Sequence, residues 1–382
     1  MMITRRRFVA LAASSGGALF IPKIIFAAAE TDRRFVFVIQ RGAADGLHIV
    51  APYAEPEYAK LRGPISSDIG EATKLDSSFA LHPALVETAK MYKAGEALFA
   101  HAVATAYRDR SHFDGQNVLE TGGRTPYELK DGWMNRLTAL LPKQKVAPIA
   151  LAPTMPMALR GSAETTSYAP LALPEPNDDL LTRVGLLYQR DPVLHPLWSA
   201  AMETRNMATK DERGQDPAAL GKLAATLLAR ENGPRIAMIE TGGWDTHTHQ
   251  VARLALLLKG FDAMLAAMRD GLGQSWGKTT VLVATEFGRT AAENGSRGTD
   301  HGTAAVVMLI GGAVKGGRII ADWPGLSQSA LYESRDLKPT MALDALIAGA
   351  AGESFSLDPQ LVMRAVFKDG SGSKPVTGLI RT

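Results

Sequence analysis

Runs of consecutive apolar residues, separated by stretches with helical periodicity, are the feature that most constrains the fold of this chain. The first run, residues 34–40, reads Arg-Phe-Val-Phe-Val-Ile-Gln, and its five central residues are all apolar. A strand with one solvated face alternates apolar and polar residues, whereas a strand covered on both faces is apolar throughout. This run therefore predicts a strand in the interior of a sheet that is covered on both sides.

Similar runs recur along the chain, and amphipathic patterns lie between them. Strands or short apolar runs are predicted at residues 34–40, 97–104, 148–152, 235–240, 279–285 and 304–310. Helices are predicted at residues 83–93, 178–190, 217–231, 250–271 and 340–351. The alternation predicts an α/β fold with a mostly parallel central sheet and helices on both faces.

The first 29 residues have the three parts of an export signal. Residues 4–9, Thr-Arg-Arg-Arg-Phe-Val, match the twin-arginine pattern. An apolar stretch at residues 8–26 follows, and three alanines at residues 27–29 form a small-residue cleavage pattern. The signal arginines are Arg5, Arg6 and Arg7. A membrane anchor is the alternative, but serines, glycines, a proline and Lys23 interrupt the apolar stretch, so we favour a cleaved signal.

The domain organisation follows from this division. We expect a twin-arginine signal peptide at residues 1–29 and a single α/β domain at residues 30–382, which is long enough to form one large domain. The twin-arginine translocase is the expected partner during export. The folded protein is expected in the periplasm or secreted, without stable membrane insertion after cleavage.

Charge and cysteine content exclude several classes of function. The net charge is +3, and removing the four positive charges of the signal leaves −1, so the exported chain has no electrostatic basis for binding nucleic acid. The sequence has no cysteine, which excludes disulfides and thiolate metal sites. Any metal must therefore bind to His, Asp, Glu or hydroxyl oxygen.

Side chains of this kind gather beside the predicted strands, where parallel sheets form their active sites. They are Asp45 after residues 34–40, Ser111 and His112 after 97–104, Asp245, His247 and His249 after 235–240, Glu286 and Arg289 after 279–285, and Asp300 and His301 before 304–310. Carboxylates and imidazoles without thiolates suit zinc, manganese, magnesium or calcium. The sequence therefore predicts a divalent metal site whose metal it does not identify.

Each of these segments also has a structural interpretation. Asp45 could begin only a turn, Ser111 could cap a helix, and Glu286 with Arg289 could form a structural ion pair. The Asp-Thr-His-Thr-His segment from Asp245 is harder to explain by packing, because three ligand-type side chains fall within five residues. The remaining histidines, which we interpret as structural, are His48, His82, His101 and His195.

Taken in order, these segments resemble the bacterial family known as domain of unknown function 1501, whose members typically carry twin-arginine signals. The resemblance rests on Asp45-Gly46, Ser111-His112-Phe113, the segment from Gly242 to His247, the segment from Glu286 to Thr290, and Asp300-His301-Gly302. That family is similar in turn to the alkaline phosphatase superfamily, which includes sulfatases. The resemblance implies an alkaline-phosphatase-like fold, one or two metals, and a hydroxyl or formylglycine nucleophile acting on phosphate or sulfate esters.

The resemblance also implies roles for individual residues. Ser111 resembles the nucleophile, and Asp45 resembles a metal ligand that faces it. Asp245 with His249 has the metal-binding spacing of the superfamily, whereas the nearer family favours His247, and both alternatives remain open. His301, with Asp300, resembles the last metal histidine.

A second metal and an arginine that binds the anion are also considered. Glu286 stands where the superfamily has an Asp-His pair, so a second metal lacks its histidine. Arg289, Arg108 or Arg110 could clamp the anion.

Two functions of different class remain. The first is a metal-dependent hydrolase or transferase that acts on a small anionic ester, a phosphate or a sulfate, through Ser111. The second is a non-catalytic exported binding or assembly protein that keeps the fold and one structural metal. An enzyme needs Asp45, Ser111 and Glu286 to converge on the metal, whereas a structural site needs only Asp245 and the histidines.

Overall fold

The computed structural model describes residues 32–67, 69–142, 147–169, 178–207, 216–367 and 372–381. The predicted signal at residues 1–29, with its arginines, lies outside this range. No helix in the described part of the chain is both long and apolar enough to cross a membrane.

Nine of the described strands form one mixed sheet, in the order β11-β5-β10-β9-β1-β8-β6-β7, with β12 also paired to β5. The strands are β1 (Arg34–Gln40), β5 (Ala97–Ala104), β6 (Ile149–Leu151), β7 (Thr166–Ser167), β8 (Ile236–Thr241), β9 (Thr279–Ala284), β10 (Ala305–Ile310), β11 (Arg318–Ile320) and β12 (Met341–Ala342). A separate small sheet pairs β2 (Val50–Ala51), β4 (Ala80–Leu81) and β3 (Thr73–Lys74).

One strand of the large sheet runs against the others. β1 pairs in parallel with β8 and β9, and the pairings of β6 with β7 and β8 and of β5 with β11 and β12 are also parallel. Only β10 is antiparallel to its neighbours, β9 and β5. The prediction of a mostly parallel sheet is confirmed, and the reversal brings the amino end of β10 to the edge where its neighbours have their carboxyl ends.

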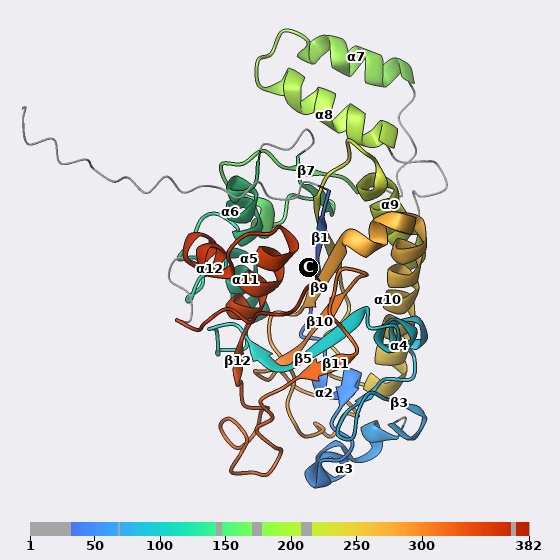
Figure 1. The fold of residues 1–382 in the computed structure, drawn as a ribbon, viewed down its shortest axis with the longest axis vertical. Helices are drawn as coiled ribbons and strands as arrows, with labels where there is room; N and C mark the ends of the chain where they lie inside the picture. Colours follow the sequence, from blue (N-terminus) through green and yellow to red (C-terminus); the bar gives the residue numbers. More distant parts are fainter. Residues whose placement is uncertain are drawn as a thin grey trace, which may run out of the picture.

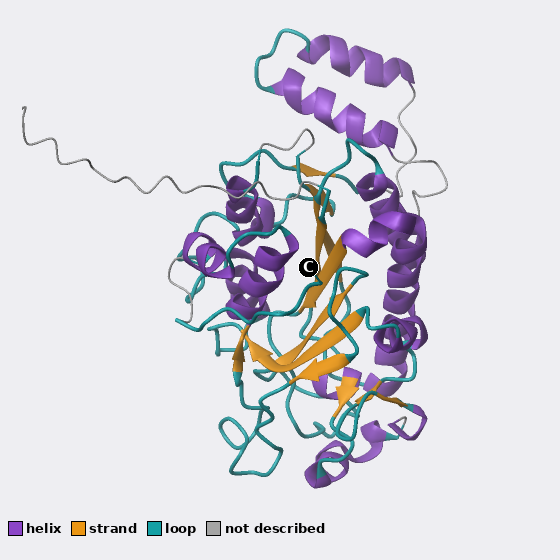
Figure 2. Ribbon diagram, in the orientation of Figure 1, coloured by secondary structure: helices purple, strands orange, loops and turns teal. Residues whose placement is uncertain are grey.

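The apolar character of β1 is explained by helices on both faces of the sheet (Figures 1 and 2). Phe35, Phe37 and Ile39 are fully buried in one core cluster, whereas Val36 and Val38 are fully buried in the other. Successive strand residues point to opposite faces, so both sets must be apolar when both faces are covered.

Different helices supply the two faces. The first core cluster draws on α5 (His112–Thr121), α6 (Trp133–Leu140), α11 (Leu343–Ser354) and α12 (Pro359–Val366). The second draws on α4 (Val86–Lys93), α9 (Pro217–Ala229) and α10 (Gln250–Leu272).

Helix α10 illustrates how the sequence pattern produces this packing. Its residues Leu254, Leu258, Phe261, Leu265 and Met268 recur every three or four positions, which places them on one face, and all are buried. Burial of each side chain contributes about 1.5–3 kcal/mol to folding. The helix ends at Gly273, whose φ of 52° lies in the left-handed region that glycine adopts readily.

The remaining elements lie around this framework. They are α2 (Gly46–Ile49), α3 (Pro56–Arg62), α7 (Asp178–Tyr188), α8 (Leu194–Met207), and the 3₁₀ turns η1 (Gly63–Ser66), η2 (Ile69–Glu71), η3 (Met157–Leu159) and η5 (Gly273–Lys278). Helices α7 and α8 form a hairpin, drawn at the top of Figure 1, in which the rings of Tyr188 and Trp198 lie 5.8 Å apart.

Candidate metal centre

The topology brings four segments to one edge of the sheet. Asp245 follows β8, Glu286 follows β9, and His301 precedes the reversed strand β10. The loop after β5 leads to His112, the first residue of α5. Because β10 is antiparallel, a residue before it and residues after its neighbours meet at the same edge.

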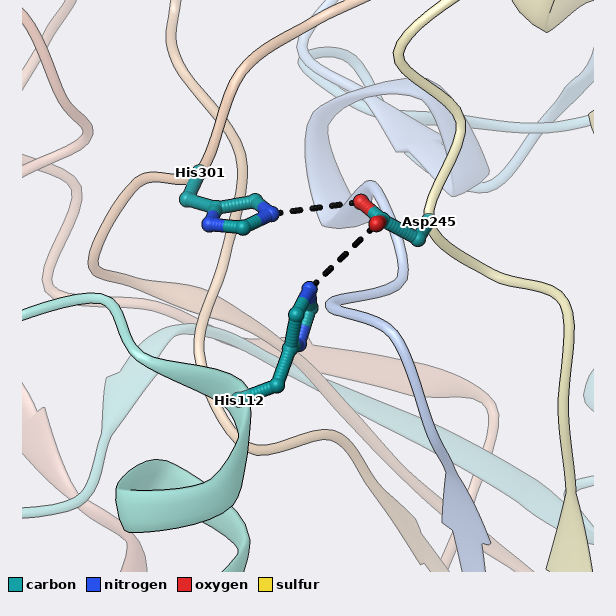
Figure 3. A group of neighbouring side chains, drawn as sticks. All are labelled: His112, Asp245 and His301. Carbon is teal, nitrogen blue, oxygen red and sulfur yellow. Dashed lines mark hydrogen bonds and ion pairs between the residues drawn. The ribbon is translucent and has the colours of Figure 1, made fainter.

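The carboxylate of Asp245 is the centre of the resulting cluster (Figure 3). Its Oδ1 lies 2.9 Å from Nε2 of His247 and 3.2 Å from Nε2 of His301. Its Oδ2 lies 3.4 Å from Nε2 of His112, and Figure 3 shows the rings of His112 and His301 directed at the two oxygens. One donor atom each from His112, Asp245 and His301 falls within 4.8 Å of the other two.

The other ring nitrogen of each histidine faces an oxygen acceptor. Nδ1 of His112 lies 2.8 Å from Oε1 of Glu286, and Nδ1 of His247 lies 3.1 Å from Oδ1 of Asp300. Nδ1 of His301 lies 3.0 Å from the carbonyl oxygen of Arg110. Since these acceptors require a proton on Nδ1, each neutral ring carries a lone pair on the Nε2 that faces Asp245.

Lone pairs that converge without a donor between them repel one another. Nε2 of His247 and Nε2 of His301 are only 3.0 Å apart. Nε2 of His112 is buried and makes no hydrogen bond within the described residues. A cation relieves both problems, and imidazoles oriented through Nδ1 by carboxylates or carbonyls are typical of metal sites. The two imidazoles and one carboxylate that converge, from His112, His301 and Asp245, are donor types that fit zinc or a similar first-row metal, and His247 lies beside them.

Glu286 lies behind His112 rather than among the donor atoms. It is buried, and its Oε1 accepts hydrogen bonds from the Gly42 backbone at 2.8 Å and from Gln116 at 3.1 Å, besides contacting His112. Burial would raise the pKa of Glu286, but the bonds from His112 and these donors lower it. The sequence placed Glu286 among the ligands, whereas in the structure its carboxylate contacts Nδ1 of His112 and not the Asp245 side of the cluster.

His247 and His249 lie differently with respect to the cluster. His247 contacts both Asp245 and His301. His249 is exposed and serves as the N-cap residue of α10, with a left-handed φ of 50°, and no contact joins its side chain to the cluster within the described chain. Asp300, predicted as a ligand, lies on the outer side of His247 and also accepts a hydrogen bond from Asn294.

Arg289 contacts the same carboxylate from the protein interior. Its buried guanidinium places Nη1 2.6 Å from Oδ1 of Asp245, and Nε donates to Thr299 at 3.1 Å. Its Nη2 is buried without a hydrogen-bond partner among the described residues. Burial would raise the pKa of Asp245, but the bond from Arg289 and its charge lower it, so Asp245 is an anion at neutral pH.

Asp45, predicted as a metal ligand, is engaged elsewhere. Its carboxylate forms a buried pair with Arg62, in which Nη2 lies 3.0 Å from Oδ1 and Nη1 contacts Oδ2. Gln250 also donates to Oδ2 at 2.6 Å. A guanidinium thus occupies the place where a second metal was considered, and the structure does not bring Asp45 into the cluster.

Ser111 lies between two residues that touch the cluster. The preceding Arg110 bonds His301 through its carbonyl oxygen, and the following His112 faces Asp245. Ser111 is the N-cap residue of α5, but its side chain makes no capping hydrogen bond. Its hydroxyl is therefore not committed to the helix, and it contacts Tyr107, whose phenol oxygen also accepts a hydrogen bond from the Ser111 backbone at 3.1 Å.

The two other arginines considered for the anion are tied to the protein. Arg110 donates to Asp336 at 2.9 Å and contacts Glu333, and Arg108 donates to the carbonyl of Tyr107 at 2.7 Å and contacts that of Thr105.

His112 is the site residue whose role the sequence analysis did not assign. Its hydrogen bond to Glu286 raises its pKa, against the effect of burial, whereas burial and then the charges of His112 and Arg289 lower the pKa of His301. The signal was present in the sequence, because His112 follows the proposed nucleophile directly and lies in the same strand-end segment.

The family model described as a protein of unknown function (DUF1501) matches residues 32–367. The chain belongs to this family. The match confirms the family suggested by the sequence motifs and spans the sheet and every residue of the candidate centre.

Solved structures give distant matches. The C-terminal periplasmic domain of EcEptC from Escherichia coli is 11% identical, with 90% of this chain and 88% of that chain covered and a TM-score of 0.42. The phosphonate monoester hydrolase of Agrobacterium radiobacter is 10% identical, with 75% and 70% covered and a TM-score of 0.31. Similarity at this level carries no information about ligand or reaction. No match was found among curated proteins.

Proposed function

We propose that this DUF1501 protein is an exported, metal-dependent hydrolase or transferase that acts on phosphate or sulfate esters. The observation that carries the proposal is the common orientation of His112, His247 and His301. Each ring has Nδ1 against an oxygen acceptor and Nε2 directed at the Asp245 carboxylate. This arrangement has the donor types of a zinc-type site and lies at the sheet edge where α/β proteins bind ligands.

The four donor residues would hold one divalent cation. Such a cation supplies positive charge that neutralises the ester oxygens and lowers the pKa of a neighbouring hydroxyl. Glu286 and Asp300 keep His112 and His247 in the tautomer that presents Nε2.

Ser111 and Arg289 would act on the ester itself. The hydroxyl oxygen of Ser111 would form a bond to phosphorus or sulfur as the bond to the leaving alcohol breaks, and water or a second alcohol would then release the product. The buried guanidinium of Arg289 would hold the Asp245 carboxylate through Nη1 and add positive charge beside the ester, where negative charge develops.

The test is elemental analysis and thermal melting of protein supplied with zinc, manganese, magnesium and calcium, alongside assays on aryl phosphates and sulfates. We expect wild type to retain one divalent ion. His301→Ala should lose it and melt at a lower temperature, because a metal at 100 times its Kd adds about 2.7 kcal/mol of stability. His195→Ala, which changes an exposed histidine on α8, is the control and should behave as wild type.

Ser111→Ala separates catalysis from metal binding. The variant should keep the metal and lose ester hydrolysis. If wild type binds none of the four metals, the proposal is wrong. If metal binds but neither phosphate nor sulfate esters react, the non-catalytic exported binding protein becomes the better description.

A further inference from the structure

A cavity of about 630 Å³ lies beside the candidate metal centre, between α9, α10 and the carboxyl end of β8. Its apolar walls include Leu220, Trp244, Leu256, Leu257, Phe261 and Met264. Pockets that hold small ligands usually measure about 300–1,000 Å³ and are mostly apolar, so both volume and lining suit an organic ligand.

Two residues of the cavity wall are informative: the ring of Trp244 is held in place, and the side chain of Leu256 is exposed. The Trp244 indole donates to Thr241 at 3.0 Å and meets the Phe261 ring edge-on at 6.0 Å, which fixes its orientation. Leu256 is 73% exposed on α10, although Leu254 and Leu258 on the same helix are buried. An exposed leucine on the rim of an apolar cavity adds to the apolar surface that a ligand would cover.

Charge in the lining does not favour an ionic occupant. Asp216, Glu240 and Lys259 are its charged members. Glu240 is bonded to Arg41 at 2.6 Å, so its charge is compensated within the protein. The occupant favoured by these walls is therefore an uncharged apolar group.

A segment of four successive residues joins the cavity lining to the metal centre along the chain. Gly242 and Trp244 line the cavity, and the next residue, Asp245, is the central carboxylate. Gly242 and Gly243 are exposed and have no side chains, so they form a low ridge between the two sites. A Cβ added at Gly242 would meet no atom within 4 Å, so the space beside Gly242 is open, whereas a Cβ at Gly243 would lie 3.3 Å from Leu257 in the cavity wall.

We propose that this cavity binds the apolar part of the substrate, an alkyl or aryl group, while the anionic ester group lies across the Gly242–Gly243 ridge at Asp245. The inference rests on the proposed function and narrows its substrate to an amphipathic ester. A second copy of the chain is a poorer occupant, because a stable interface buries at least about 1,200 Å² and the feature here is a concavity.

The first experiment uses calorimetry on the zinc-loaded protein with two series, linear alcohols and the matching alkyl phosphates, from ethyl to octyl. Affinity should rise about fourfold for each added methylene, which is the effect of burying one CH₂ group. Phosphates should bind more tightly than alcohols of the same length. The alcohols test the cavity independently of the metal centre.

Two variants test the cavity and the segment between the cavity and the metal centre separately. Leu256→Asp should reduce the chain-length effect in both series, and Leu187→Asp, at a 77% exposed leucine on α7, should not. Gly242→Leu should abolish the advantage of long alkyl phosphates over alcohols. Gly277→Leu is the matched control, because Gly277 also has no atom within 4 Å of an added Cβ and lies outside the cavity.

Affinity that does not depend on chain length, or that Leu256→Asp leaves unchanged, overturns the inference. So does a phosphate advantage that survives Gly242→Leu, since the two sites would then be separate. If Leu256→Asp instead dissociates a dimer detected by sedimentation, the cavity belongs to a contact between copies. Chain-length dependence with no ester hydrolysis contradicts only the proposed reaction.

Discussion

At the residue scale, the candidate centre depends on the different contacts of the two nitrogens of each imidazole. Nδ1 is bound to an oxygen on the protein side, and Nε2 is presented to Asp245. The outer residues Glu286 and Asp300 therefore determine which nitrogen is available. Replacing such an outer partner in metal sites typically costs 10–100-fold in affinity.

Glu286→Gln tests this at His112. The bond to Glu286 raises the pKa of His112 above 6.5, and metal binding requires the neutral ring. Wild-type metal affinity should therefore fall as pH drops through the raised pKa of His112. The variant should bind about 10–100-fold more weakly at pH 8 but lose metal at a lower pH. Zinc titration between pH 5 and pH 8.5 measures both effects.

The folding stability of the metal-free protein should change with pH in the opposite direction to the metal affinity, falling as pH rises. A histidine whose folded pKa is raised adds stability below its unfolded pKa, and this stability is lost as pH rises through the folded value. The lowered pKa of His301 works against this, so the comparison of wild type with Glu286→Gln isolates the contribution of His112. An unchanged pH profile in the variant would contradict the role given to Glu286.

The residue types of the site were predictable from the sequence, but their arrangement around the centre was not. Asp245, His247 and His301 were identified because ligand-type side chains follow or precede buried strands. Glu286 was placed among the ligands because no sequence pattern distinguishes a carboxylate that binds a metal from one that orients a histidine. His112 lacked an assigned role because its contact with Glu286 joins residues 174 positions apart, which no local sequence pattern reports.

At the element scale, helix α3 is tied to the sheet by the buried pair between Arg62 and Asp45. Both side chains are almost fully inaccessible, so removal of one leaves the other charged in a low-dielectric environment.

Arg62→Met should cost about 3–5 kcal/mol in free energy of unfolding, measured by urea denaturation. Asp45→Asn combined with Arg62→Met should recover part of this loss, because no isolated charge remains. Lys60→Met removes an exposed pair with Glu57 on the same helix and should cost under about 1 kcal/mol. Equal small losses for Arg62→Met and Lys60→Met would show that the buried pair is not holding α3.

Long apolar strands and amphipathic helices were predictable because their patterns are local. Residues 34–40 and 97–104 were predicted as strands with the bounds that β1 and β5 have. Helix α5, which carries His112, was predicted only at its start, where Ser111 was considered as a cap and is the N-cap residue. Its extent was not predicted, because its residues show no clear apolar periodicity and its most exposed side chain is the apolar Phe113. The reversal of β10 depends on pairing with distant strands, which sequence periodicity does not report.

At the scale of the whole molecule, the proposed export signal would set where any reaction takes place. Arg5→Lys with Arg6→Lys should retain the protein in the cytoplasm, because the translocase reads an arginine pair and the change removes both the Arg5-Arg6 and the Arg6-Arg7 pair. Arg7→Lys keeps the first pair and should be exported. Cell fractionation with and without the twin-arginine system measures this, and normal periplasmic accumulation of the double variant would refute the export route.

The position of β1 in the sheet also determines when the chain can complete its fold. Its two neighbours are β8 and β9, and β9 ends roughly 250 residues after Phe35. At about 5–20 residues per second, a ribosome needs roughly 12–50 s to synthesise that interval. During this time a strand of five consecutive apolar residues has no permanent partner and is exposed to misassociation. The sheet around β1 can therefore form only after β8 and β9 have been synthesised. A chaperone that shields residues 34–40 during synthesis would increase the yield of folded protein.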